Sequence, residues 1–259
     1  MNQTQNIQES KKPLITKKIM IEIKDLKKSF GDNHVLNGFN LKLFEGENLV
    51  LMGKSGSGKS VMIKCLVGLM QPDSGLIKVM DKDISTLNRN EFDKLRTEIG
   101  FLFQGSALYD SMTVRENLEF PLRRNKYKFG NFTDTSELVT EALERVGLVD
   151  AIDLMPAELS GGMKRRVALA RTLILKPKII LYDEPTSGLD PITSKEIIEL
   201  MRRIQSQYKT SSLIITHDVD CARVSSERMI LLVDGINYVE GTFDELYALK
   251  DEKVRAFFK

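Results

Sequence analysis

Residues 53–60 read Gly-Lys-Ser-Gly-Ser-Gly-Lys-Ser, and this stretch decides the fold. It fits the pattern G-x-x-x-x-G-K-[ST] at every fixed position, namely Gly53, Gly58, Lys59 and Ser60. Glycines let successive backbone N–H groups turn inward around anionic oxygens. The lysine can then reach the terminal phosphates of a nucleoside triphosphate, and the serine hydroxyl can bind Mg²⁺. The stretch therefore predicts a nucleotide site.

The sequence on either side of this loop supports the prediction. Residues 47–52 read as a short buried strand, and residues 61–70 are apolar on nearly all sides. Such an apolar segment is typical of a helix enclosed in an α/β core. The loop therefore joins a strand to a helix whose N-terminus points at the phosphates. A chance glycine-rich turn, the alternative, would not need this context.

Composition limits the kinds of protein that the chain can be. Its 259 residues are enough for one large α/β domain, and 42% hydrophobic and 29% charged residues are ordinary for a globular protein. A net charge of +2 gives no argument for nucleic acid as a partner. Cys65 and Cys221 lie far apart without metal-type spacing, so we expect two small buried side chains and a reducing compartment.

Targeting and membrane-spanning signals do not stand out in the sequence. No apolar run is long enough to cross a bilayer, and the polar N-terminus lacks a signal-peptide pattern. We therefore expect a cytosolic chain that acts at a membrane only through a partner.

The residue patterns divide the chain into a polar tail, a helical block and an α/β part that surrounds this block. Residues 1–18 are polar and are expected to be a disordered tail. A block of helices is expected over about 88–175, inserted into an otherwise α/β domain. The segments expected to form strands are 20–23, 39–43, 77–79, 99–103, 179–182, 213–216 and a hairpin at 229–233 and 236–239.

Two acidic residues follow one of these apolar strands. Asp183 ends the strand at 179–182, and Glu184 comes next. Acids at the carboxyl edge of a parallel sheet lie where ligands bind. Asp183 is therefore the expected partner of Mg²⁺, and Glu184 could orient a water for attack on the γ-phosphate. The alternative is an acidic turn that only caps a helix.

A second candidate anion site opens a helix further along the chain. Ser160 is a plausible N-cap, and Gly161 and Gly162 leave first-turn N–H groups uncovered. By itself this would be a simple cap. A second phosphate site in one chain makes sense if it serves a nucleotide held by another copy. The basic residues at 164–166 are expected to form a solvated helix face, and Arg171 to pair with an acid.

At this point the chain resembles the ATP-binding cassette (ABC) family over about residues 20–245. Leu159–Met163 is similar to its signature motif, although Met163 stands where the family usually has glutamine. The resemblance implies that Phe30 stacks on adenine, that Gln104 touches Mg²⁺ and the transporter partner, and that His217 contacts the γ-phosphate. The alternatives without a role in nucleotide binding are an aromatic residue of the core for Phe30, an amide in a loop for Gln104 and a structural histidine for His217.

The resemblance also implies a fold and a domain organisation. We expect the α/β P-loop NTPase core of the ABC ATPase type, with an N-terminal antiparallel β subdomain and an inserted α-helical subdomain. A single ABC ATPase domain would occupy residues 19–245, followed by a short tail at 246–259. Some family members clasp the neighbouring subunit with a longer C-terminal arm, so a short tail suggests a dimer that depends on ATP and the permease.

The implied mechanism is an ATP-dependent, head-to-tail homodimer. Each ATP would lie between the Gly53–Ser60 loop of one copy and the Ser160–Gly162 helix start of the other. Catalytic roles fall to Glu184, His217 and Lys59, and Mg²⁺ would be held by Ser60, Gln104 and Asp183. The residues expected to contact the nucleotide are Phe30, Gly53, Lys54, Ser55, Gly56, Ser57, Gly58, Lys59, Ser60, Val61, Gln104, Ser160, Gly161, Gly162, Asp183, Asp190 and His217.

Details point to one branch of the family. The stretches 58–61 and 103–114, and Met163, resemble the Mla-type ATPases. That resemblance implies a cytoplasmic-face subunit at the bacterial inner membrane that moves phospholipids between envelope membranes. Its partners would be permease subunits, an MCE-domain lipid-binding protein and a small accessory subunit, with no nucleic acid. Alternatives are another cargo (lipoprotein, amino acid or metal chelate) or a soluble ABC ATPase acting on ribosomes or DNA.

Overall fold

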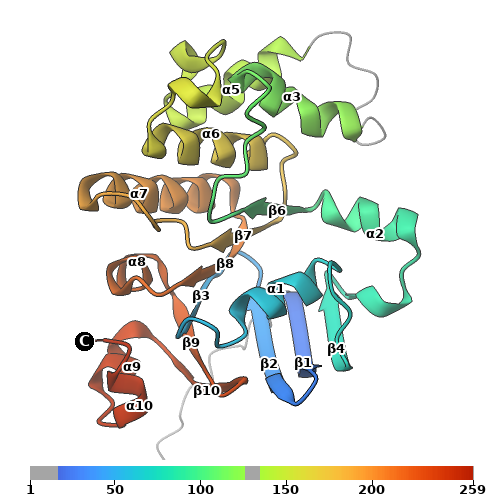
Figure 1. Ribbon diagram of the computed structural model, residues 1–259, viewed down its shortest axis with the longest axis vertical. Helices are drawn as coiled ribbons and strands as arrows, with labels where there is room; N and C mark the ends of the chain where they lie inside the picture. Colours follow the sequence, from blue (N-terminus) through green and yellow to red (C-terminus); the bar gives the residue numbers. More distant parts are fainter. Residues whose placement is uncertain (1–16, 126–134, 259) are drawn as a thin grey trace, which may run out of the picture.

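A computed structural model describes residues 17–125 and 135–258. Figure 1 shows two sheets and a group of helices farthest from the smaller sheet. Nearly all of the expected N-terminal tail lies outside the described residues, and so does the segment 126–134. None of the described helices combines the length and the apolar character that a membrane crossing requires.

The smaller sheet has four strands in the order β2-β1-β4-β5, and every pair is antiparallel. The segments predicted at 20–23, 39–43 and 77–79 are parts of longer strands. The predicted segments were too short because polar residues on the exposed face of this sheet interrupt the apolar pattern. The expected antiparallel subdomain is confirmed. Its strands are β1 (Ile19–Phe30), β2 (Asn33–Phe44), β4 (Ser74–Val79) and β5 (Lys82–Asp83).

The larger sheet has six strands in the order β10-β9-β3-β8-β7-β6. Five of them run parallel, and β10 joins β9 as the predicted antiparallel hairpin. The expected helical insertion over about 88–175 contains β6, which belongs to this sheet, so the outer helical layer begins only at residue 114. The strands are β3 (Asn48–Gly53), β6 (Ile99–Leu102), β7 (Ile179–Asp183), β8 (Ser211–Thr216), β9 (Arg228–Val233) and β10 (Ile236–Gly241).

Successive side chains of the central strands point to opposite faces of the larger sheet and so belong to two separate parts of the hydrophobic core. In β3, Val50 and Met52 join the core on the side of the helical layer, whereas Leu49 and Leu51 join the core on the side of the smaller sheet. The same alternation holds in β7, β8 and β9 because successive side chains of a strand point to opposite faces. A sheet buried on both faces explains why these strands read as continuous apolar runs.

Helices cover both faces of the larger sheet. The first helix packs between the two sheets, and α3, α5 and α6 form the layer at the top of Figure 1. The predicted tail at 246–259 contains the end of one short helix, which begins at Phe243, and the whole of a second one, and both pack on the core through Leu246 and Val254. The helices are α1 (Lys59–Leu66), α2 (Arg89–Arg96), α3 (Val114–Arg124), α5 (Ser136–Val146), α6 (Gly161–Leu173), α7 (Pro191–Tyr208), α8 (Val219–Ser225), α9 (Phe243–Ala248) and α10 (Glu252–Arg255).

Candidate functional site

The candidate site lies at the carboxyl edge of four neighbouring parallel strands. The 53–60 loop follows β3, and His217 follows β8. Asp183 ends β7, and Gln104 stands two residues after the end of β6. The strand order places these segments side by side along one edge, which is where open α/β sheets bind ligands. Sequence motifs far apart in the chain therefore meet in one region.

Backbone conformation shapes the loop between β3 and α1. Gly58 caps α1 in the left-handed region with φ of 103°, and a Cβ there would come within 2.9 Å of the Val35 carbonyl oxygen. The Ser57 N–H donates to the Lys54 carbonyl at 3.1 Å, which closes a turn. The Ser57 hydroxyl is buried and has no hydrogen-bond partner among the described residues. A glycine at 58 is thus a structural requirement of the loop.

We expect Gly58→Ala to weaken binding of ATP with Mg²⁺ by about 5- to 150-fold, because the added Cβ forces strain of about 1–3 kcal/mol into the loop. Isothermal titration calorimetry measures the affinity. Gly46→Ala is the matched control, because Gly46 also has a positive φ (70°), a Cβ there meets nothing within 4 Å, and the residue lies outside the phosphate loop. Equal affinities for the two variants would contradict the steric argument.

Lys59 lies within the loop and is already hydrogen-bonded. Its Nζ donates to the carbonyl oxygens of Gly53 at 2.6 Å and Lys54 at 2.9 Å. Burial lowers the pKa of Lys59, and the nearby carboxylates of Glu184 and Asp183 act in the opposite direction. The ammonium is therefore held at the loop by neutral acceptors, close to two acids.

Asp183 is partly buried and lies near three charged side chains. Burial raises the pKa of Asp183, and the Glu184 carboxylate raises it further, while Lys59 and Arg165 oppose this rise. A divalent cation would favour the ionised form of the carboxyl, as the two side-chain cations do. The site is thus built to receive positive charge.

The residues present fit a Mg²⁺ ion that arrives with a nucleotide. Ser60 and Asp183 line one cavity of about 290 Å³, together with Phe103, which precedes Gln104. Within residues 17–125 and 135–258, no group of three or more His, Cys, Asp or Glu side chains is placed to hold a metal. Mg²⁺ is commonly held by one or two protein ligands and by phosphate oxygens, so this donor set suits it.

Glu184 and His217 are in direct contact. The His217 Nδ1 lies 2.8 Å from the Glu184 Oε2, and the His217 backbone N–H also reaches this oxygen at 3.3 Å. Glu184 has a positive φ of 49°, and its own N–H donates to the Ile215 carbonyl at 2.8 Å. A non-glycine residue held in this sparsely populated conformation is common at functional sites.

Other predicted site residues lie further from the loop. The Gln104 Nε2 donates to the Ser187 hydroxyl at 3.3 Å, and the Asp190 carboxylate caps α7 by accepting from the N–H groups of Ile192 and Thr193. Ser160 is exposed and caps α6, where it accepts from the Met163 N–H at 3.2 Å. Figure 1 shows α6 in the helical layer, separated from α1. Within one copy, the two candidate phosphate sites are therefore apart.

Phe30 and Val61 were predicted to contact the nucleotide. Phe30 stands 49% exposed at the end of β1, with Lys28 over its ring, and it does not line the cavity beside the loop. That cavity is lined instead by His34 and Val35. Val61 is partly buried and packs against the core on the side of the smaller sheet. Nucleotide contact by Phe30 and Val61 stays a prediction.

The predicted solvated face at 164–166 is wrong for Arg165. Its side chain is 3% exposed and donates to the carbonyl oxygens of Phe103 at 2.7 Å and Ser187 at 3.3 Å. Arg171 also differs from expectation, because it bonds Asn117 Oδ1 and the Ser106 carbonyl rather than an acid. A signal existed in the sequence: position 165 falls on the same helical stripe as the buried residues 168, 169 and 172.

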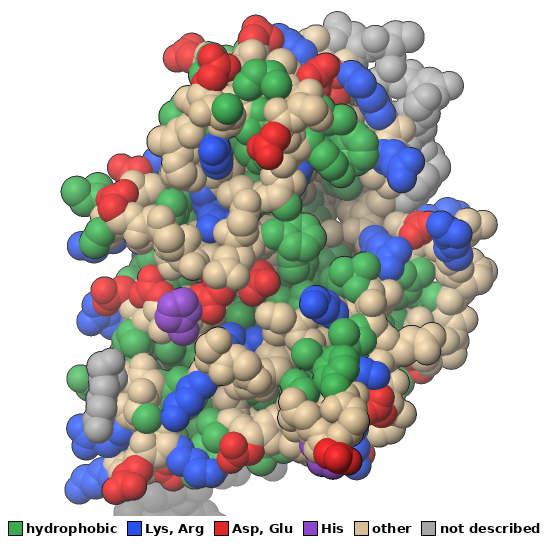
Figure 2. Space-filling model, in the orientation of Figure 1, with side chains coloured by type: hydrophobic (Ala, Val, Ile, Leu, Met, Phe, Trp, Pro, Cys, Tyr) green, Lys and Arg blue, Asp and Glu red, His purple; other side chains and the backbone are tan. Residues whose placement is uncertain are grey.

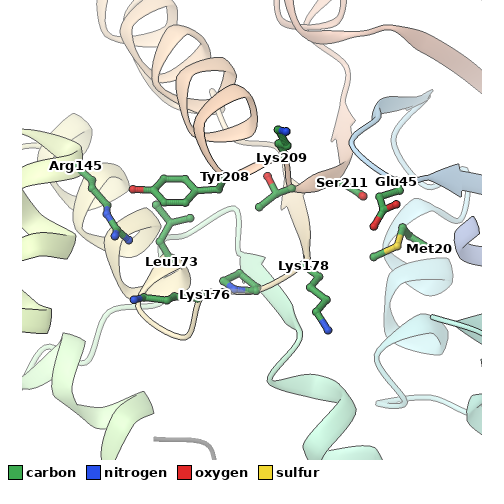
Figure 3. Close-up of a pocket in the computed structure, with 11 residues that line it drawn as sticks. Met20, Glu45, Arg145, Leu173, Lys176, Lys178, Tyr208, Lys209 and Ser211 are labelled. Atoms are coloured by element: carbon green, nitrogen blue, oxygen red, sulfur yellow. The ribbon is translucent and has the colours of Figure 1, made fainter. Parts of the chain in front are cut away.

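A separate pocket of about 230 Å³ lies at the opposite edge of the sheet, where β7 and β8 begin. Four basic side chains line it, together with Tyr208 and Leu173. Figure 3 shows the amino groups of Lys178 and Lys209 pointing away from each other, so the pocket does not gather its cations around one point. The basic residues are Arg145, Lys176, Lys178 and Lys209.

A phosphate loop between strand and helix, with an acid pair at the carboxyl edge of the same sheet, defines an ATPase of the P-loop class. A sequence model of the family described as ABC transporter matches residues 36–187. The chain is also 44% identical over 216 residues to the methionine import ATP-binding protein MetN of Clostridium tetani, covering 83% of this chain and 67% of the relative. The chain belongs to the ABC transporter ATP-binding family.

Solved structures share this fold. The chain resembles cbiO1 from Clostridium perfringens, part of the transporter complex cbiONQ, with a TM-score of 0.80 and 30% identity, covering 92% of this chain and 93% of the other. It also resembles the dimeric ATP-binding cassette MJ0796 bound to ADP and Pi, with a TM-score of 0.77 and 33% identity, covering 86% and 99%. The expected ABC ATPase fold is confirmed, and the chain is an ATPase.

Proposed function

We propose that this chain is the ATP-hydrolysing subunit of an ABC transporter and that it works as a dimer on a separate membrane permease. The observation that carries the proposal is the order of the segments along one sheet edge: the phosphate loop, His217, the Asp183–Glu184 pair and Gln104. Relatives named as import ATP-binding proteins and a dimeric cassette support both halves of the proposal.

Each residue of the edge has a role in this proposal. Lys59 binds the terminal phosphates, and Ser60 and Asp183 hold the Mg²⁺ ion, which when bound neutralises charge on the phosphate oxygens. Glu184 orients the attacking water, and His217, which contacts the Glu184 carboxylate, faces the γ-phosphate. Catalysis is then mostly positioning and charge stabilisation.

The dimer in this proposal is head-to-tail. Ser160 opens α6 with an exposed side chain, and Gly161 and Gly162, which follow it, add no side chain of their own to the first turn. A helix N-terminus of this kind binds anions. Since α6 lies apart from α1 in the same copy, its anion is the ATP of the other copy.

Two cargo classes compete. The name of the MetN relative favours amino-acid import, which the sequence alone left as an alternative. Phospholipid transport with an MCE-domain partner rests on the resemblance at 58–61, 103–114 and Met163, and the relatives described above do not support it. We therefore place amino-acid import first and phospholipid transport second.

Affinity purification of the tagged chain from its own bacterium, in mild detergent, discriminates between these functions. We expect a membrane permease to co-purify, together with ATPase activity that the permease stimulates. A solute-binding protein that takes methionine or another amino acid would favour import. An MCE-domain protein with bound phospholipid would favour the second cargo. Ribosomes or DNA without a permease would refute the transport function.

A further inference from the structure

The buried guanidinium of Arg165 is the feature of this site that the proposed roles do not use. Arg165 lies on the second turn of α6, five residues after Ser160. In the part of the chain that the structure describes, it bonds only the carbonyl oxygens of Phe103 and Ser187, and its Nε has no partner. Burial lowers the pKa of Arg165, and the negative charge of Asp183 acts in the opposite direction. A buried cation without a carboxylate in direct contact is costly, which calls for a reason.

The two carbonyls belong to two different segments of the site. Phe103 immediately precedes Gln104, and Ser187 accepts from the Gln104 side chain at 3.3 Å. The Ser187 N–H in turn donates to the Glu184 carbonyl at 3.2 Å, which closes the turn after β7. The planar fork of an arginine holds its donors on two separate nitrogens at a fixed spacing, whereas a lysine donates from a single nitrogen. Arg165 thus joins α6, the Gln104 segment and the Glu184 turn.

We propose that Arg165 is a positioning residue that keeps Gln104 and the Glu184 turn in register with α6. The inference rests on the proposed function, since Arg165 links the helix that begins at Ser160 to the residues that orient water and Mg²⁺ in that function. When α6 shifts relative to the sheet, both segments shift with it because they share one guanidinium. Arg165 itself touches neither nucleotide nor metal and acts through these two segments.

Arg165→Met tests the link, because it keeps an unbranched apolar stem at this position and removes the guanidinium donors. We expect kcat for ATP to fall by about 10- to 100-fold, the loss that a small misplacement of reacting groups produces, with KM and the ATP affinity of the monomer changed less than about twofold. The matched control is Arg203→Met, an exposed arginine on α7, which should keep the wild-type kcat. A parallel loss of kcat and of ATP affinity would overturn the positioning role.

Hydrogen exchange of the nucleotide-free protein gives a second readout that needs no activity. In Arg165→Met, peptides covering 99–112 and 184–190 should exchange faster together, while β3 and α1 keep the wild-type rate. Unchanged exchange in both peptides would refute the link even if the ATPase works normally. Conversely, a wild-type chain without ATPase activity would refute the proposed function, and the exchange data would still decide the role of Arg165.

Arg165→Lys separates the fork from the charge, and it serves if the methionine variant does not fold. One ammonium keeps the positive charge near Asp183 but cannot span both carbonyls in the same way. We expect a kcat between those of the wild type and the methionine variant. Wild-type kcat in Arg165→Lys would show that charge alone suffices and would overturn the bridge.

Discussion

Glu184→Gln is expected to bind ATP with normal affinity and to hydrolyse it about 10²–10⁴-fold more slowly, the range that loss of a general base produces. Glutamine keeps the size of the side chain and an oxygen for the His217 contact, which is 2.8 Å in this structure. It cannot accept a proton from the attacking water. Because ATP then stays intact between two copies, we also expect an ATP-bound dimer to accumulate.

Phosphate release measures the rate in Glu184→Gln, and sedimentation with and without ATP measures the dimer. Glu199→Gln is a suitable control, because Glu199 is an exposed acid on α7 and should keep both wild-type values. Turnover of Glu184→Gln at the wild-type rate would remove Glu184 from the catalytic role.

Ser160→Arg is the second change for which we expect a large effect. It removes the hydroxyl that caps α6, which is worth about 0.5–2 kcal/mol of stability, and it places a long side chain where the second ATP phosphate would lie. ATPase activity should fall by at least about 10²-fold, as when one donor to a developing charge is lost. ATP affinity of the monomer should not change, since Lys59 and its loop are untouched.

Mixing two inactive variants tests whether the site is shared between copies. In a head-to-tail dimer of a Lys59→Ala copy and a Ser160→Arg copy, both defects fall in one site, and the other site is intact. The mixture should therefore regain activity that neither variant has alone. If each site were formed within one copy, both sites would be defective and the mixture would stay inactive. That result would refute the head-to-tail dimer.

The fold and the carboxyl-edge residues were predicted from the strand pattern together with the resemblance of the motifs to the ABC family. Gly53–Ser60, Asp183 and His217 each follow a short apolar run, and such runs predict neighbouring strands because a sheet covered on both faces has no polar side. The limits of the elements were harder to predict. Only four residues of β1 were expected in a strand, because its polar residues lie on an exposed face.

Contacts between distant segments could not be predicted from spacing. Arg165 was expected in solvent because arginine is seldom buried without a charged partner, and the carbonyls that accept its bonds lie 62 and 22 residues away in the sequence. The pairing of His217 with Glu184 likewise depends on the order of β7 and β8 in the sheet. The apolar pattern predicts which segments are strands, but only the structure shows which strands are neighbours in the sheet.

The hydrogen bonds of Lys59 have a consequence for product release. In this structure its ammonium donates to the carbonyl oxygens of Gly53 and Lys54. A buried cation left without acceptors costs several kcal/mol, so a lysine bonded only to phosphate would hold back the departing nucleotide. Here the two carbonyl oxygens belong to the loop itself and are within hydrogen-bond distance of the ammonium. We therefore expect that release of ADP does not leave the Lys59 ammonium without hydrogen-bond acceptors.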